Sequence, residues 1–177
     1  MRKLILAVAL VVAASLTVVA AVAIAGGGGQ HKASLNGYNE VVGGPPNNMG
    51  SVSTTGTGSL RLRIEDDGIH FRLRYSNMEG TDVTQAHIHF AQRHVGGGVI
   101  AFLCGGTEDP CTEPNGDIDG VITPAEILGP SNQGIEPGSF AEAVRAIRAG
   151  ATYANVHSTP RWPMGEIRGQ IDRGGDD

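Results

Sequence analysis

Three histidines in two distant segments have the residue type and spacing of a metal-binding group. His87 and His89 lie in the segment A-H-I-H-F at residues 86–90, and His157 ends the segment Y-A-N-V-H at residues 153–157. Side chains alternate across a β-strand, so His87 and His89 share one face, with Cα atoms about 7 Å apart. Neutral imidazoles bind copper or zinc, and these two can reach one ion. If both segments join one sheet, His157 supplies a third ligand.

The same histidines also fit a purely structural network. Their ring nitrogens can satisfy buried carbonyl groups or a carboxylate, and Asn155 and Arg168 can complete polar contacts between strands. The residue pattern is compatible with both interpretations, and from the sequence we favour the structural network. The side chains expected to complete or flank a metal site are those of Tyr153, His94 and Glu166.

A second candidate is a calcium loop over residues 115–126, which read N-G-D-I-D-G-V-I-T-P-A-E. Oxygen donors occupy its first, third and fifth positions, a glycine the sixth and a glutamate the twelfth. The ligands would be Asn115, Asp117, Asp119 and Glu126. The alternative, which we favour, is a strand and turn leading into a capped helix. The preceding residues are rich in helix breakers, and T-P-A-E at residues 123–126 has the form of a capping box.

Both cysteines lie in one short loop. Cys104 and Cys111 flank the stretch G-G-T-E-D-P. In an exported protein such a pair is expected to form a local disulfide, which would contribute about 2 kcal/mol to stability. A metal-thiolate or redox role is less favoured, because the spacing is not C-x-x-C and no histidine lies close by in the sequence.

The N-terminus has the features of a secretory signal peptide. Arg2 and Lys3 precede an apolar run at residues 4–25, which ends in the small-x-small pattern A-I-A. We expect a signal peptide at residues 1–25 and a flexible glycine-rich leader at residues 26–31. The alternative is an uncleaved membrane anchor through the apolar run, because about 20 apolar residues can cross a bilayer.

Composition narrows the classes of partner and of activity. The whole sequence carries a net charge of −5, and loss of Arg2 and Lys3 with the signal peptide makes the mature chain more acidic. Nucleic acid needs a basic surface, so it is not expected as a partner, and the membrane is expected only if the leader is retained. No nucleophile motif such as G-x-S-x-G is evident. We therefore expect no enzymatic activity.

Alternating segments predict one mostly β domain. Residues 57–75 form a hairpin with apolar residues on one face, four arginines on the other and D-D-G at the turn. Further strands are expected near residues 83–91, 99–103, 117–122, 151–157 and 166–172. Two short helices with capping boxes, starting at Thr123 and Ser139, are expected as a late insertion. The predicted fold is an antiparallel β-sandwich or barrel-like domain at residues 32–172, followed by a disordered tail at residues 173–177.

The histidine segments resemble the CHRD domain, the module named after chordin. The resemblance rests on A-H-I-H and on the later Y-x-N-V-H with G-E-I-R-G-Q, whose family-motif positions are Asn155, Gly165, Glu166, Arg168 and Gly169. It implies a secreted β-sandwich-like domain and, loosely, protein binding. The expected function is an exported, non-enzymatic binding or structural module for an unknown extracellular protein or cell-surface ligand. The alternative is a copper- or zinc-binding β-sandwich protein that uses the three histidines.

Overall fold

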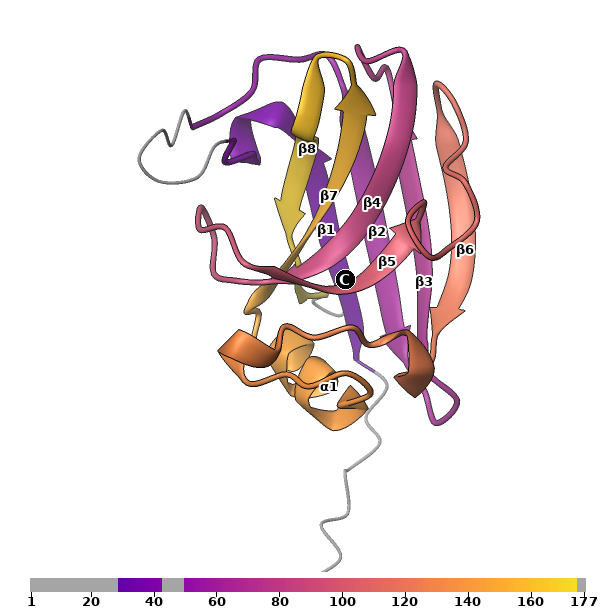
Figure 1. Ribbon diagram of the computed structural model, residues 1–177, viewed down its shortest axis with the longest axis vertical. Helices are drawn as coiled ribbons and strands as arrows, with labels where there is room; N and C mark the ends of the chain where they lie inside the picture. The colour runs from indigo at the N-terminus through magenta and orange to yellow at the C-terminus, as the bar shows by residue number, and fades with distance from the viewer. Residues whose placement is uncertain (1–28, 43–49, 175–177) are drawn as a thin grey trace, which may run out of the picture.

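The computed structural model describes residues 29–42 and 50–174 and shows a mostly β fold (Figure 1). The expected signal peptide or anchor, residues 26–28 of the leader and residues 175–177 of the tail lie outside the described residues. In the part of the chain that is described, no helix is long and apolar enough to cross a bilayer. The elements, in chain order, are β1 (Gln30–Asn36), η1 (Gly37–Asn39), β2 (Thr57–Ile64), β3 (Ile69–Ser76), β4 (Asp82–Phe90), β5 (Gly98–Cys104), β6 (Gly116–Ile122), η2 (Pro124–Glu126), η3 (Ser131–Gln133), α1 (Phe140–Arg148), β7 (Thr152–Thr159), β8 (Trp162–Gln170) and β9 (Asp172–Arg173).

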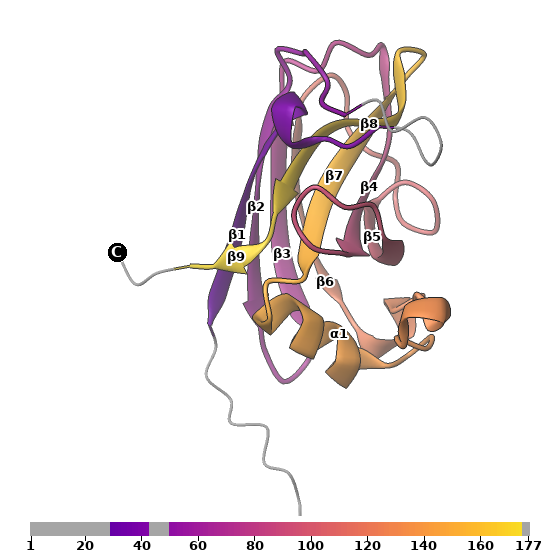
Figure 2. The same ribbon diagram turned by 90° about the vertical axis from the view of Figure 1, so that its left-hand side faces the viewer.

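The strands form a single antiparallel sheet in the order β5-β4-β7-β8-β1-β2-β3-β6, with β9 beside β1. The sheet curls until it is nearly closed and barrel-like, with α1 at one end (Figures 1 and 2). The prediction of a mostly β, antiparallel fold is confirmed. One continuous curved sheet takes the place of the two sheets of a sandwich. β1 begins at Gln30, within the expected leader, and β9 includes Arg173, within the expected tail.

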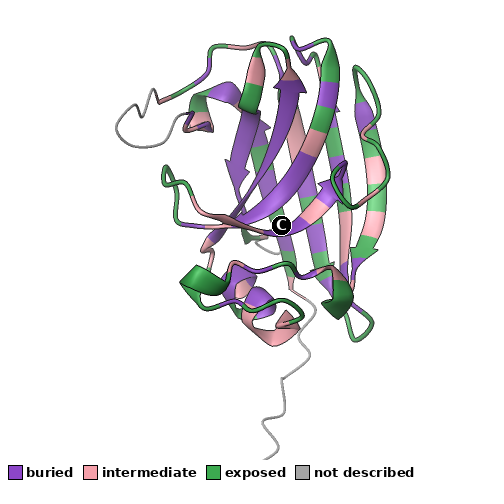
Figure 3. Ribbon diagram, viewed as in Figure 1, coloured by how far each residue is buried: buried purple, intermediate pink, exposed green. Residues whose placement is uncertain are grey.

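The β2–β3 hairpin follows the predicted alternation. Leu60 pairs with Leu73 across the two strands, and neither residue is exposed to solvent. Arg61 pairs with Arg72 in the next row, and both lie on the exposed face. The apolar face therefore lines the inside of the curved sheet, while the arginines face solvent, as Figure 3 shows by the alternating colours of these strands.

Strands β4, β7 and β8 differ from the hairpin because both of their faces are buried. Ile88, Val156 and Ile167 point into the apolar core and are at most 1% exposed. The alternate positions are also buried but polar, and they carry the histidines of β4 and β7 (Figure 3). A strand that is buried on both faces usually has a continuous apolar sequence, so buried polar residues at alternate positions of these strands are unusual.

The connection between β4 and β5 covers these polar residues. It lies in front of β7 in Figure 2. Three side chains of the sheet hold its backbone: Arg168 donates to the carbonyls of Gln92 and Val95, Gln170 donates to that of Ala91, and His89 bonds to that of Gly97. The cover is therefore fixed by hydrogen bonds from the residues that it buries.

The late insertion contains one α-helix and not the two helices that were expected. Residues 124–126 form a single 3-10 turn, in which the Glu126 carboxylate accepts the Thr123 N–H of the predicted capping box. The second helix exists as α1, but the Ser139 side chain makes no capping hydrogen bond. α1 ends just before Gly150, whose positive φ of 68° is typical of the residue that follows a helix. A cis Gly129–Pro130 peptide follows the 3-10 turn.

The predicted disulfide is confirmed. Cys104 at the end of β5 is bonded to Cys111, with their Cα atoms 5.0 Å apart. The bond closes a local loop in the connection from β5 to β6, which are the two edge strands of the curved sheet. It therefore restrains the chain at the place where the sheet is not joined by hydrogen bonds.

Candidate metal centre

The pairing of β4 with β7 brings the three histidines together. In this register His89 lies opposite Tyr153, His87 opposite Asn155, and Gln85 opposite His157. Because side chains alternate, both histidines of β4 and the histidine of β7 project from the same face of the sheet. The convergence expected from the sequence is therefore present, and it depends on the pairing of strands that lie 68 residues apart at His87 and Asn155.

The three imidazoles offer nitrogen atoms that all lie within 4.8 Å of one another. His87 Nδ1 and His89 Nε2 are 3.2 Å apart. The ring centroid of His87 lies 4.8 Å from that of His157 and 5.1 Å from that of His89, with the rings edge to face. Zinc–nitrogen bonds are about 2.0–2.1 Å long, so one ion can contact three nitrogens at this spacing after small side-chain movements.

Two of the rings are anchored from behind by backbone carbonyls. His89 Nδ1 lies 2.9 Å from the Gly97 oxygen, and His157 Nδ1 lies 3.0 Å from the Pro163 oxygen. A carbonyl oxygen only accepts, so Nδ1 carries the proton in both rings, and Nε2 of each neutral ring presents a lone pair to the group. Metal-ligating histidines have this arrangement, in which the outer nitrogen is bound and the inner one is available.

Asn155 joins the rings into a hydrogen-bonded network without a metal. Its Oδ1 lies 3.3 Å from His87 Nδ1, and its Nδ2 donates to His157 Nε2 at 2.8 Å. The Nδ1–H of His87 then donates to His89 Nε2 and Asn155 Oδ1 together. This is the structural alternative read from the sequence, and every inner nitrogen has a partner in it. A bound metal would require the proton of His87 to move from Nδ1 to Nε2.

Burial keeps the three histidines neutral. It lowers the pKa of His87 to about 3, with the charges of His157 and His89 adding to the effect. The pKa of His89 falls to about 4, again chiefly through burial, and burial also lowers that of His157. Neutral imidazole is the form that binds a metal, so the rings are in the correct state at neutral pH without a proton having to leave the group.

Tyr153 and Arg168 form one wall of the group. The Tyr153 ring stacks on His89 at 4.6 Å between centroids, and the Arg168 guanidinium carbon lies 3.3 Å above the same ring. β7 lies between β4 and β8, and Tyr153 is opposite His89 on β4 and diagonal to Arg168 on β8. Phe102 of β5 packs against His87 at 4.6 Å between ring centroids. These rings keep the imidazoles in fixed orientations.

Glu40 is a residue of this region that the sequence pattern did not reveal. It follows η1, is 3% exposed, and its Oε1 accepts the Val41 N–H at 2.9 Å. Its Oε2 is buried without a hydrogen-bond partner. Gly165 makes room for it, because a β-carbon there would lie 2.4 Å from Glu40 Oε2 and 3.2 Å from Asn155 Nδ2. No local motif marks Glu40, although the glycine in G-E-I-R-G-Q offered an indirect signal.

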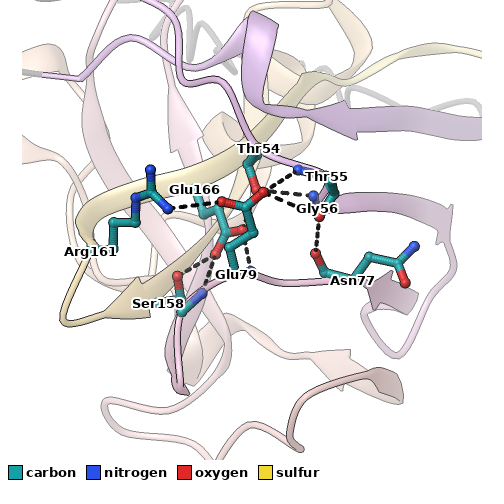
Figure 4. Close-up of polar contacts among 9 residues, drawn as sticks. Thr54, Thr55, Gly56, Asn77, Glu79, Ser158, Arg161 and Glu166 are labelled. Atoms are coloured by element: carbon teal, nitrogen blue, oxygen red, sulfur yellow. Dashed lines mark hydrogen bonds and ion pairs between the residues drawn. The ribbon is translucent and has the colours of Figure 1, made fainter.

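Glu166 does not join the histidines. Its Oε1 accepts the Thr54 hydroxyl at 2.6 Å and the Glu79 N–H at 2.7 Å, and its Oε2 accepts from Ser158 and from the Gly80 N–H (Figure 4). It is fully buried. The carboxylate therefore fastens loops to β7 and β8 and is separate from the histidine group.

The predicted calcium ligands do not converge, so the calcium loop over residues 115–126 is not formed. Most of it is strand β6, in which Asp117 and Asp119 project from an extended backbone. Asp117 is paired with Arg72 and Arg74, and Glu126 bonds to its own turn. Asn115 Oδ1 accepts the Asn77 N–H at 3.2 Å. Alternate oxygen donors suit a strand face as well as a calcium loop, and here the strand forms.

The other histidines and motif positions have separate roles. His94 is exposed in the β4–β5 connection, with a positive φ of 62°, and does not flank the group. His70 bonds to Asp67 at 2.8 Å, and together with Glu65 they form an exposed acidic cluster at the β2–β3 turn. Gly169 permits close contact between β8 and β1, because a β-carbon there would lie 2.3 Å from the Ser34 oxygen.

Comparisons with known proteins identify the family of the chain. Neither the curated proteins nor the solved structures contain a significant match. The family model of the CHRD domain matches residues 31–171, which span the sheet from β1 to the end of β8 and include the histidine group. The chain therefore belongs to the CHRD domain family.

Proposed function

We propose that this protein is an exported, non-enzymatic CHRD module that binds one copper or zinc ion through His87, His89 and His157. The observation that supports this most directly is the convergence of three neutral imidazole nitrogens within 4.8 Å. Each ring comes from a paired, buried strand, so the group is held by the sheet and not by a mobile loop. A rigid, preformed ligand set reduces the cost of ordering side chains on binding.

The outer hydrogen bonds give the proposal its second support. The carbonyls of Gly97 and Pro163 set the tautomers of His89 and His157. For a purely structural network, any arrangement in which all donors and acceptors are paired would suffice. A metal, in contrast, needs Nε2 of both His89 and His157 to be unprotonated. The observed pattern meets the narrower requirement. Imidazole-only coordination suits copper and zinc better than calcium, which prefers oxygen.

The proposed location and partners follow from other features. The apolar run at residues 4–25 has the form of a signal peptide, and the disulfide between Cys104 and Cys111 suits an oxidising compartment. We propose that the module is secreted and that its partner is an extracellular protein or cell-surface ligand. In this view the metal stabilises the domain and its surface and takes no part in a reaction. Retention of the leader would place the same domain at a membrane.

Elemental analysis of the exported protein, purified without a histidine tag, tests the metal. We expect about one equivalent of copper or zinc, and its loss in His89→Ala. The matched control is His70→Ala, which removes a partly exposed histidine on β3, outside the group. In parallel, zinc at one hundred times its Kd should stabilise the wild-type protein by about 2.7 kcal/mol and raise its Tm.

Two outcomes would contradict the proposal. If the wild-type protein holds no metal and its Tm does not change with copper or zinc, the structural network through Asn155 is the correct description. If His70→Ala loses as much metal as His89→Ala, the ion binds at the β2–β3 turn and not at the three histidines.

A further inference from the structure

Glu40 is the one carboxylate among the described residues with a buried oxygen that has no hydrogen-bond partner. We propose that Glu40 is the charge-balancing carboxylate of the metal centre and raises its affinity for a divalent cation. The inference rests on the proposed function and deepens it, because it assigns to the site an anionic group that belongs to no sequence motif. It also predicts the charge of the cation that the site prefers.

The position of Glu40 beside the histidines is set by a glycine and an amide. Glu40 Oε2 and Asn155 Nδ2 both lie within 3.2 Å of the point where a β-carbon of Gly165 would stand. That same Nδ2 is 2.8 Å from His157 Nε2. The orphan oxygen is therefore separated from the imidazoles by a single amide group. Any side chain at Gly165 would occupy the space through which the carboxylate approaches.

In the metal-free protein, few groups offset the cost of burying the charge of this carboxylate. Its other oxygen accepts the neighbouring Val41 N–H, and the Asn155 amide lies close enough to lower the pKa of the carboxyl to a smaller extent. Arg168 is close enough to favour the charged form, but its guanidinium donates to the carbonyls of Gln92 and Val95 and lies over Tyr153. Burial accordingly raises the pKa of Glu40. A buried polar atom without a partner is destabilising, and native proteins contain few of them.

A bound cation would supply the missing compensation. Three neutral imidazoles leave the whole charge of a divalent ion in a buried site, next to the positive charge of Arg168. That arrangement is unfavourable unless an anion lies nearby. Glu40 is placed to be that anion, and the ion in turn favours the ionised carboxylate. The interaction is proportional to the charge of the ion, so it is larger for Zn²⁺ than for Cu⁺.

The test compares Glu40→Gln with the wild-type full chain in its exported form. We expect the Kd for Zn²⁺ to rise 10–100-fold, which is the usual effect of removing a group behind metal ligands. The Kd for Cu⁺, measured under anaerobic conditions with a competing chelator, should rise only about 3–10-fold. The charge of Cu⁺ is half that of Zn²⁺, so its Coulomb energy with the carboxylate is halved, and the fold-change becomes the square root of that for Zn²⁺. The Tm of the metal-free variant should rise by about 2–4 °C, because a buried uncompensated carboxylate has been neutralised.

Two further variants complete the experiment. Glu40→Asp keeps the charge but shortens the side chain, and it should recover part of the Zn²⁺ affinity lost in Glu40→Gln. Glu166→Gln is the matched control, since it neutralises the other buried glutamate; it should lower the Tm and leave the Kd for Zn²⁺ unchanged.

The results separate the two proposals. If the wild-type protein binds no metal, the proposed function fails and Glu40 has no cation to balance. If the wild-type protein binds Zn²⁺ and Glu40→Gln binds it equally well, the metal centre stands and the role of Glu40 is overturned. A lower Tm in metal-free Glu40→Gln would also overturn it, because the carboxylate would then be a stabilising structural group.

Discussion

Two buried glutamates of this protein lie in opposite kinds of environment. Glu166 is fully buried, and four donors point at its two oxygens (Figure 4). Glu40 is 3% exposed, and one of its oxygens has no partner. Both belong to the same polar part of the molecule, around β7 and β8. The chain therefore satisfies one buried carboxylate completely and leaves the other open beside the histidines.

The difference distinguishes a carboxylate that stabilises the fold from one that is available to a ligand. The region around Glu166 has the features of a structural junction, because its donors come from two loops and from β7, and the carboxylate fastens them to β8. In the histidine region, backbone carbonyls set the tautomers of His89 and His157, and one oxygen of Glu40 has no hydrogen-bond partner. Unsatisfied buried polar groups are uncommon in native proteins, and the position of the one at Glu40, beside the histidines, supports the proposed cation.

The largest expected effect is that of Glu166→Ala. Removing the carboxylate leaves the hydroxyls of Thr54 and Ser158 and the N–H groups of Glu79 and Gly80 without their acceptor, which should lower the free energy of unfolding by about 4 kcal/mol. Chemical denaturation of the metal-free protein measures this. A loss below about 1 kcal/mol would mean that the junction is not structural, and the contrast with Glu40 would disappear.

Acid should destabilise the histidine region next most strongly. His87 and His89 have pKa values of about 3 and about 4 in the folded protein, against about 6.5 in the unfolded chain. Between these values the unfolded chain binds more protons, so the free energy of unfolding falls as the pH falls below 6.5. From pH 6.5 to 4.5 each of the two histidines should contribute a loss of about 2 kcal/mol.

Denaturation of the metal-free protein at several pH values measures this slope. The variant His87→Gln should have a shallower slope over the same range, whatever its stability at neutral pH. An unchanged slope in the variant would show that His87 is protonated equally in the folded and unfolded states, in conflict with its burial.

Gly165→Ala should have a similar but slightly smaller cost, and it tests the space reserved for Glu40. Gly165 has a φ of 124°, which side chains rarely adopt, and its β-carbon would collide with Glu40 Oε2. We expect a loss of about 2 kcal/mol in the free energy of unfolding. In a double-mutant cycle with Glu40→Ala, part of the loss should be recovered because the collision is removed. Strictly additive effects would place the Glu40 carboxylate elsewhere.

The smallest effect concerns a single hydroxyl group at the structural junction, that of Thr54. Thr54→Val keeps the shape of the side chain and removes its hydrogen bond to Glu166 together with the acceptor of the Gly56 N–H, so the free energy of unfolding should fall by about 1–2 kcal/mol. The Kd for Zn²⁺ should not change. A measurable change in the metal affinity of Thr54→Val would show that the two regions are coupled through β8.

The strands of the fold were predictable because their alternation is local. Each residue of the β2–β3 hairpin reports its own face, and the D-D-G turn marks the reversal. The helices were less predictable because a capping box is a local pattern that does not determine length. Both T-P-A-E and S-F-A-E have the pattern, but only the second begins an α-helix. The cis Gly129–Pro130 peptide follows the first and has no sequence signature.

The histidines of the site were predictable and its carboxylate was not. His87 and His89 are spaced for one strand face, and His157 could be placed by the same counting. The contact of Glu40 with Gly165 and Asn155 is set by the order of strands in the sheet, which places β8 beside both β7 and β1. That order cannot be read from periodicity. The calcium hypothesis relied on a local pattern that is not specific, because D-x-D at residues 117–119 suits a strand as well as a loop.

The position of the single tryptophan of the sequence provides an optical reporter. Trp162 begins β8 and immediately precedes Pro163, whose carbonyl accepts the His157 N–H. Its indole nitrogen is buried without a hydrogen-bond partner, and movement of this backbone would change the surroundings of the ring. Paramagnetic Cu²⁺ at the three histidines would quench that emission, whereas Zn²⁺, with its filled d shell, would change it only through movement of the backbone. The native fluorescence can therefore distinguish the two metals without a label.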